Sequence, residues 1–281
     1  TIQTIKFDMD YIILNGEIIK KHESGFTPFF WEEPFTVTQK CWFGFGGIPL
    51  FHENVDSIKT ILKTLNIKIP GLFSDERELF RITKRMLNKN RFYRSGIINF
   101  QLFIDRDKTN TIINSSAFAE FDFPMSKQGL ICNFSEFEKY SVNPLNQFAF
   151  FNAPHWKFTE DRNRETTFDN SIFINEKGFV CDCISANIFL IKGKVLYTPS
   201  IETGCYIDSL RSYVLQIGRE LNLKITESDS IKKEDIFQMN EIFLASETCG
   251  IQWLLGIDNK RFVHNYSLKI HERLNDFFKK K

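Results

Sequence analysis

The sequence lacks any long apolar run: no stretch approaches the roughly 20 residues that a membrane span needs. It also lacks an excess of charge, because 36 Lys and Arg residues stand against 35 Asp and Glu residues, for a formal net charge of +1. Nucleic-acid and anionic-membrane partners both need a basic footprint, so we expect neither. Residues 1–6 show no signal-peptide layout, and we therefore expect a cytoplasmic protein.

The sequence also lacks the spacings that mark a metal site or a hydrolase nucleophile. Of the six cysteines, only Cys181 and Cys183 lie close together, and no second pair follows at the spacing of a zinc site. The five histidines show no ligand spacing, so we predict no metal. A Ser/His/Asp elbow motif is missing, and the glycines at 44, 46 and 47 lack the strand–helix setting of a phosphate loop.

Phenylalanine, in contrast, is abundant, with 31 residues in a chain of 281. This indicates aromatic-rich packing and is compatible with a large subunit interface. The hydrophobic share of 42% and the charged share of 25% are typical of a globular protein with a sizeable core.

The first half of the chain alternates hairpin and helix signals. Asn15-Gly16 is a typical hairpin turn, and Asp75 can cap a helix whose buried side would include Phe80. Apolar residues at steps of three and four mark another helix from Glu53. In chain order, the patterns predict hairpins at residues 11–19 and 42–51, helices from residues 53 and 75, and long strands at residues 96–104 and 111–123.

The second half reads mainly as antiparallel strands followed by helices. The predicted strands are residues 171–175, 179–181, 187–191, 194–197 and 241–245. The predicted helices run from about 207, over 232–239 and over 268–280. We interpret residues 125–129 as a linker between an N-terminal lobe, residues 1–124, and a C-terminal lobe, residues 130–281. The mixed order predicts an α+β fold in two lobes.

The segment from Asp169 to Arg211 carries an ordered set of motifs. Between its ends lie a turn with a glycine, an acid, an Asn-Ile-Phe strand, a Thr-Pro step and a second glycine: Gly178, Asp182, Asn187-Ile188-Phe189, Thr198-Pro199 and Gly204. In order and spacing the segment resembles aminotransferase class IV, the fold-type-IV pyridoxal-phosphate (PLP) superfamily. That superfamily contains branched-chain and D-amino-acid aminotransferases and aminodeoxychorismate lyases. Further segments resemble other steps of the same family: residues 14–17, 49–52, 240–244 and 250–252.

The resemblance covers most of the chain and is closer in the C-terminal lobe than in the first 130 residues. It implies the two-lobed fold of D-amino-acid aminotransferases, with an N-terminal α/β sandwich lobe and a C-terminal β-barrel-like lobe surrounded by helices. It also implies a homodimer and a small acidic ligand in the cleft between the lobes. An aromatic motif of the family's N-terminal lobe is matched only by residues 30–37, which lack its glycines.

The resemblance places an alanine where the family has its Schiff-base lysine. PLP enzymes need that lysine amine to form the internal aldimine. Asp182 stands for the family's pyridine-binding Glu, and counting back from it by the family's spacing gives Ala149, with Asn152 in register. Alanine has no nucleophile. The nearest downstream lysine is Lys157, and we interpret it as a solvated helix residue and only a weak substitute.

The family's other cofactor contacts are replaced as well. The phosphate-binding Arg falls on Val55, and the Tyr that bonds the ring hydroxyl falls on Pro154. The two phosphate-binding Thr residues fall on Leu210 and Glu247, with Thr248 adjacent to the second. Each charge-assisted contact of this kind contributes about 1.5–3 kcal/mol, so losing several predicts very weak PLP binding. By family position, the cleft is lined by Val55, Ala149, Asn152, Pro154, Asp182, Asn187, Leu210, Glu247 and Thr248.

Three functions stay open at this point. The first is a pseudoenzyme that has lost PLP-dependent catalysis, holds no cofactor and acts as a small-molecule-binding or partner protein. The second is a PLP-independent lyase-type enzyme acting on a chorismate-like or keto-acid substrate, by analogy with the family. The third is an active PLP-dependent aminotransferase or aminodeoxychorismate lyase that uses Lys157 or a shifted register.

Overall fold

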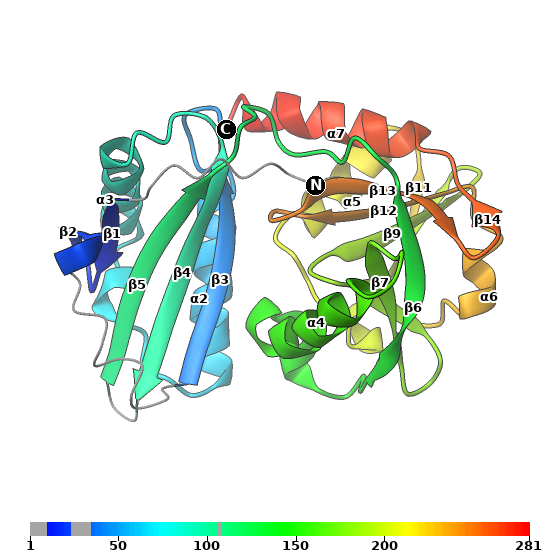
Figure 1. Ribbon diagram of the computed structural model, residues 1–281, viewed down its shortest axis with the longest axis horizontal. Helices are drawn as coiled ribbons and strands as arrows, with labels where there is room; N and C mark the ends of the chain where they lie inside the picture. Colours follow the sequence, from blue (N-terminus) through cyan, green and yellow to red (C-terminus); the bar gives the residue numbers. More distant parts are fainter. Residues whose placement is uncertain (1–9, 24–34, 106–107) are drawn as a thin grey trace. The chain divides into compact units, whose positions relative to one another are not determined.

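The computed structural model describes residues 10–23, 35–105 and 108–281 (Figure 1). The chain divides into two compact units, residues 1–122 with residue 281, and residues 123–280. Most of the expected aromatic motif, residues 30–34, lies outside the described residues. Among the residues described, every helix is too short or too polar to cross a membrane.

The first unit contains an antiparallel five-stranded sheet in the order β2-β1-β5-β4-β3. Its strands are β1 (Tyr11–Leu14), β2 (Glu17–Lys20), β3 (Phe35–Phe43), β4 (Gly96–Asp105) and β5 (Lys108–Ala117). The predicted turn between β1 and β2 is confirmed, and both turn residues have positive φ, 48° at Asn15 and 98° at Gly16. Asn and Gly tolerate this conformation, which suits the twist of a hairpin.

Two helices, α2 (Phe51–Thr64) and α3 (Glu76–Lys89), pack against β3 and β1 respectively. Four of the five apolar residues predicted for α2 are fully buried (Val55, Ile58, Ile61 and Leu62), and the fifth, Leu65, is the partly buried C-cap. The Asp75 side chain caps α3 by accepting from the Glu78 N–H at 3.0 Å. Two short 3₁₀ turns complete the unit: η1 (Lys21–Glu23) and η2 (Gly71–Phe73).

Three details of the first unit differ from the prediction. The strand predicted over residues 111–123 is β5, and it ends at Ala117. Phe80 is 38% exposed, because it lies at the edge of the buried face of α3 rather than on it. Residues 42–51 form the turn of the predicted second hairpin without its returning strand: β3 ends at Phe43, an antiparallel Gly44–Gly47 bridge closes the turn, and α2 begins at Phe51. The cluster of glycines therefore makes a tight turn that leads into a helix.

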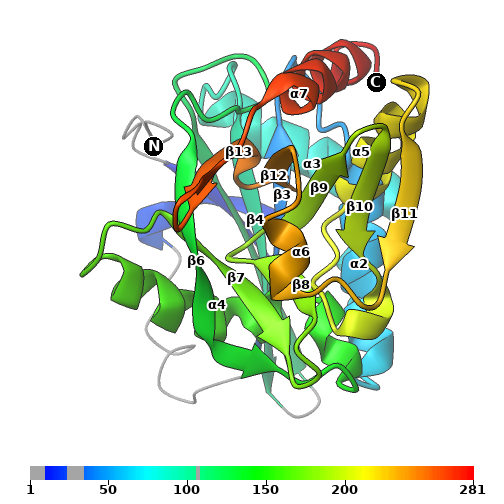
Figure 2. The ribbon, with the colours of Figure 1, turned by 90° about the vertical axis from the view of Figure 1, so that its right-hand side faces the viewer.

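The second unit is built on a curved nine-stranded sheet in the order β11-β10-β9-β12-β13-β6-β7-β8, with β14 paired to β13 (Figure 2). The strands are β6 (Leu130–Lys139), β7 (Asn170–Asn175), β8 (Val180–Cys183), β9 (Asn187–Lys192), β10 (Val195–Pro199), β11 (Lys224–Ser228), β12 (Glu241–Ser246), β13 (Gly250–Ile257) and β14 (Lys260–Arg261). The sheet is mixed, because β6 pairs in parallel with β7 and β13, and β10 with β11. Its curvature brings β8, at one end, back beside β9.

Four α-helices belong to this unit: α4 (Ala149–Asn163), α5 (Arg211–Glu220), α6 (Lys233–Ile236) and α7 (Asn265–Phe278). Two 3₁₀ turns precede α4 and α5: η3 (Pro144–Gln147) and η4 (Ile201–Thr203). Glu241, 1% exposed, fixes the start of α7 by accepting from the backbone N–H groups of Asn265, Tyr266 and Ser267 at 2.9, 2.8 and 2.6 Å. A carboxylate at a helix N-terminus stabilises the free N–H groups there.

The structure bears out the predicted α+β fold, with strand positions in the second half close to those expected. The helix expected from residue 207 begins only at Arg211, because residues 207–210 form a hydrogen-bonded turn before it. Strands β3, β6, β11, β13 and β14 were not predicted.

Candidate functional site

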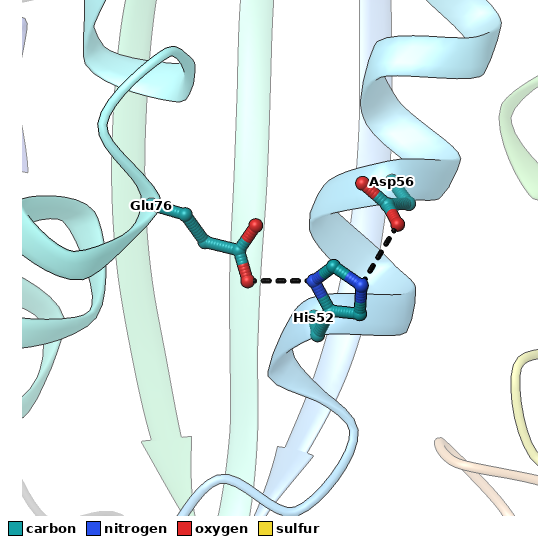
Figure 3. A group of neighbouring side chains, drawn as sticks. All are labelled: His52, Asp56 and Glu76. Atoms are coloured by element: carbon teal, nitrogen blue, oxygen red, sulfur yellow. Dashed lines mark hydrogen bonds and ion pairs between the residues drawn. The ribbon is translucent and has the colours of Figure 1, made fainter.

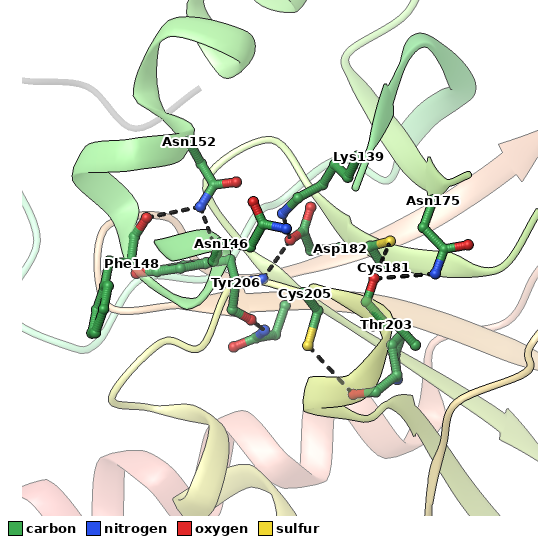
Figure 4. Close-up of polar contacts among 12 residues, drawn as sticks. Lys139, Asn146, Phe148, Asn152, Asn175, Cys181, Asp182, Thr203, Cys205 and Tyr206 are labelled. Atoms are coloured by element: carbon green, nitrogen blue, oxygen red, sulfur yellow. Dashed lines mark hydrogen bonds and ion pairs between the residues drawn. The ribbon is translucent and has the colours of Figure 1, made fainter. Parts of the chain in front are cut away.

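Asp182 is a buried carboxylate of the second unit and is paired with a lysine. It is on β8, it is fully buried, and Lys139 at the end of β6 places its Nζ 2.6 Å from Asp182 Oδ2 (Figure 4). The backbone N–H of Tyr206 donates to the same oxygen at 2.5 Å. Among the described residues, Asp182 Oδ1 has no hydrogen-bond partner. The result is a buried ion pair with one open acceptor.

Burial raises the pKa of Asp182, while the Lys139 ammonium and the Tyr206 N–H lower it and offset part of that effect. Lys139 itself is 7% exposed, so both members of the pair are removed from solvent. Two charges in such a place depend on each other, because either one alone would be an uncompensated charge in the interior.

A second buried carboxylate, Asp208, lies in the turn before α5. Its Oδ1 accepts from the backbone N–H groups of Leu210 at 2.9 Å and Glu247 at 3.1 Å. Its Oδ2 accepts from the Tyr206 hydroxyl at 2.8 Å, and its own N–H donates to Asn187 Oδ1 at 3.0 Å. Burial raises the pKa of Asp208, and the hydrogen bonds from Leu210, Tyr206 and Glu247 lower it. Donors from two separate elements thus converge on one side chain.

Tyr206 joins the two carboxylates, since its backbone binds Asp182 and its hydroxyl binds Asp208. Its ring is 6% exposed and meets Trp156 edge-on, with 5.0 Å between the ring centroids. Burial, followed by the charge of Asp208, raises the pKa of the Tyr206 hydroxyl well above its usual value. The phenol is therefore a neutral hydrogen-bond donor, packed in a cluster that also contains Phe173, Cys181, Ile184 and Cys205.

Ala149 is the first residue of α4, and its side chain packs against this cluster. Asn152 holds the start of the helix, with its Nδ2 donating to the carbonyl oxygens of Asn146 at 2.6 Å and Phe148 at 2.8 Å. Pro154 is exposed, in the middle of α4. Lys157 is also exposed and its Nζ pairs with Asp161 Oδ1 at 2.8 Å, so the structure does not bring its amine to Asp182.

The remaining predicted positions are apolar or already bonded. Val55 is fully buried in α2 of the first unit, and Leu210 is fully buried at the start of α5. Glu247 is 2% exposed, and Thr248 Oγ1 lies 3.2 Å from Ser246 Oγ. Of the predicted positions, the structure thus gathers Ala149, Asn187, Leu210 and Glu247 around Tyr206 and the carboxylates of Asp182 and Asp208.

His52 forms a separate polar cluster in the first unit (Figure 3). Its Nε2 lies 3.1 Å from Asp56 Oδ2 and its Nδ1 lies 2.8 Å from Glu76 Oε1. The Glu76 hydrogen bond, reinforced by the charge of Asp56, raises the pKa of His52. Sequence spacing did not reveal this group, because Glu76 is on another helix. The three side chains are close enough to share a cation, but Lys59 already places its ammonium 3.4 and 3.5 Å from the same two carboxylates.

Sequence reasoning missed Lys139 and Asp208. Lys139 is on β6, a strand that was not predicted, and it precedes the segment in which a substitute lysine was sought. Asp208 had a usable signal, because an Asp just before a helix commonly accepts from N–H groups of the first turn.

As placed, these residues do not fit the cofactor that the resemblance implies. Ala149 supplies no amine for an aldimine. The Asp182 carboxylate, at the family's ring-nitrogen position, already has a positive partner, because its Oδ2 binds the Lys139 ammonium. The N–H groups at Leu210 and Glu247, the two positions of the family's phosphate-binding threonines, already bind the Asp208 carboxylate, which would repel a phosphate dianion.

Comparison with known proteins agrees with the architecture. The crystal structure of branched-chain aminotransferase from Thermoproteus uzoniensis with norvaline superposes with a TM-score of 0.82 at 18% identity, covering 96% of each chain. The branched-chain amino acid aminotransferase of Escherichia coli gives 0.83 at 16% identity, covering 96% of this chain and 95% of that one. At these identities the likeness concerns the fold.

Among curated sequences, a Rickettsia conorii protein named "Probable branched-chain-amino-acid aminotransferase" is 25% identical over 116 residues. That alignment covers 40% of this chain and only 39% of the relative, so it relates part of each protein to the other. The family model "Amino-transferase class IV" matches residues 62–253, which is more than half of the chain. The chain therefore belongs to the aminotransferase class IV family.

Proposed function

We propose that this chain has lost PLP-dependent catalysis and acts as a small-molecule-binding or partner protein on the aminotransferase class IV fold. The observation that carries the proposal is the buried pair of Lys139 and Asp182, 2.6 Å apart. In the family, by the resemblance, the residue at position 182 binds the cofactor ring nitrogen. Here that carboxylate has its positive partner from within the chain.

The position of the Lys139 amine also argues against its use as a substitute for the missing lysine. The Lys139 ammonium is bound to Asp182, the carboxylate that the resemblance assigns to the ring nitrogen of a cofactor. Ala149, in contrast, is placed at the start of α4, where the resemblance puts the reacting amine. The position of Lys139 therefore supports loss of PLP-dependent catalysis rather than transfer of the Schiff-base role to another lysine.

The test is reaction of the purified chain with excess PLP, followed by borohydride reduction, intact mass measurement and peptide mapping. We expect no aldimine absorbance at one equivalent per chain, and only scattered labelling of exposed lysines. The variant Lys157→Met is the matched control, because it removes an exposed lysine near the site without touching the buried pair. Stoichiometric labelling of Lys139 or Lys157, with aldimine absorbance, would refute the proposal and favour an active PLP enzyme.

For the ligand we propose a small carboxylic acid, because the solved and curated relatives are named for branched-chain amino acids. Calorimetric titration with branched-chain amino acids and their keto acids, without PLP, tests this class directly. Consumption of a chorismate-like or keto acid in the same samples would instead favour a PLP-independent lyase-type enzyme. If none of these acids gave heat of binding or turnover, small-molecule binding would be excluded for this class, and the role of a partner protein would remain.

We also propose a cytoplasmic location, and a homodimer as the resemblance implies. Sedimentation equilibrium tests the assembly, since a chain of 33.1 kDa should give about twice that mass in a dimer. A single species at the monomer mass would contradict it.

A further inference from the structure

Three donors surround the side chain of Asp208. The N–H groups of Leu210 and Glu247 meet at Oδ1, and the Tyr206 hydroxyl binds Oδ2. The donors come from two separate places: Tyr206 and Leu210 lie in the segment that leads into α5, and Glu247 lies in the turn after β12. Convergent N–H and O–H groups of this kind are the usual means by which proteins bind oxyanions.

The carboxylate inside this group of donors has no positive partner. Asp208 is 5% exposed, and it forms no ion pair with any residue in the described ranges. A buried carboxylate without a counter-ion is costly unless hydrogen bonds to the charged form replace its hydration. The three donors do this for Asp208, whereas Asp182 depends on an ammonium.

We propose that Asp208 is a tethered anion that occupies an oxyanion site, one that would otherwise take a free phosphate group. The site is closed in this chain because the occupant is covalently part of it. This inference rests on the proposed function, since a carboxylate and a cofactor phosphate cannot share the same N–H groups. It goes further by assigning a role to Asp208 and a ligand class to the space that its side chain fills.

The test uses the full chain with Asp208→Ala, and inorganic phosphate as the probe. Removing the carboxylate leaves the N–H groups of Leu210 and Glu247 and the Tyr206 hydroxyl without their acceptor, and a phosphate ion can replace it. We expect a saturable rise in Tm with phosphate over chloride at equal ionic strength, together with broadening of the ³¹P resonance. The unsubstituted chain should show only the unspecific salt effect.

The matched control is Asp229→Ala, which removes an exposed aspartate of the same unit. Phosphate stabilises many proteins unspecifically, so the control must respond as the unsubstituted chain does. If Asp208→Ala folds poorly, phosphate should restore its folding cooperativity where chloride does not. A response of Asp208→Ala no larger than that of Asp229→Ala would overturn the inference.

The two proposals can fail independently. Labelling of a lysine by PLP in the unsubstituted chain would refute the proposed function whatever phosphate does. A negative phosphate result with Asp208→Ala would remove the tethered anion and leave the absence of a Schiff-base amine untouched.

Discussion

Replacing Lys139 by methionine is the perturbation with the largest expected effect on stability. Methionine keeps the length of the side chain and removes the ammonium, which leaves the fully buried carboxylate of Asp182 with only the Tyr206 N–H. Removing one partner of a buried ion pair costs about 3–5 kcal/mol. At roughly 2–4 °C per kcal/mol for a chain of this size, Tm should fall by about 6–20 °C.

The loss should depend on pH in a defined direction. Burial already raises the pKa of Asp182, and Lys139 lowers it, so the variant has the higher pKa. A carboxyl whose folded pKa lies above its unfolded value favours the folded state at low pH and disfavours it as pH rises. The difference between Lys139→Met and the unsubstituted chain should therefore shrink as the pH falls below neutrality.

Urea unfolding followed by tryptophan fluorescence measures both effects. Lys157→Met is the control, because it breaks an exposed pair that contributes no more than about 1 kcal/mol. A double variant, Lys139→Met with Asp182→Leu, should recover much of the loss, since it removes both charges together. A Lys139→Met variant within 1 kcal/mol of the control, with no pH dependence, would refute the reasoning.

Further predictions concern the amine, the thiols, a glycine and His52. Ala149→Lys restores an amine but should not by itself yield an aldimine with PLP, because Lys139 still binds Asp182 and Asp208 still binds the Leu210 N–H. Absorbance of the aldimine measures this. Five of the six cysteines are buried, and burial raises the pKa of Cys205 to about 11, so a thiol reagent should titrate only Cys249 before unfolding. Gly204→Ala should cost more than about 1 kcal/mol in urea unfolding, because φ is 77° and the added Cβ would lie 2.8 Å from Asn146 Nδ2. Hydrogen bonding to Glu76 raises the pKa of His52, so protonated His52 stabilises the fold fully below about pH 6.5, and this contribution is lost as the pH rises through the raised pKa. His52→Gln should therefore flatten this part of the dependence of the unfolding free energy on pH.

The strands with regular apolar runs and glycine turns could be predicted from the sequence. The hairpin at Asn15-Gly16 and the strands around Phe173 and Phe189 follow from local chemistry, because turn type and β-branched or aromatic content act over a few residues. Strand β6 could not be predicted in the same way. Its partners β7 and β13 bind it in parallel, and such pairings are fixed by distant parts of the chain.

The same limit explains which candidate site residues the sequence could name. Ala149, Asp182, Leu210 and Glu247 follow from spacing along the chain, so the resemblance locates them. The residues that bind at these positions, Lys139 and Asp208, do not follow from spacing along the chain. Lys139 reaches Asp182 across 43 residues of sequence, and Asp208 reaches the N–H of Glu247 across 39, so only the fold brings them together.

The central claim is that Lys139 and Asp208 occupy the groups that would bind the cofactor's ring nitrogen and phosphate. Crystals soaked in PLP test this claim most directly. The account predicts electron density for Lys139 Nζ against Asp182, density for the Asp208 carboxylate on the N–H groups of Leu210 and Glu247, and no pyridine ring between them. A ring bonded to Asp182, with its phosphate on those N–H groups or its carbonyl carbon joined to any lysine, would contradict it.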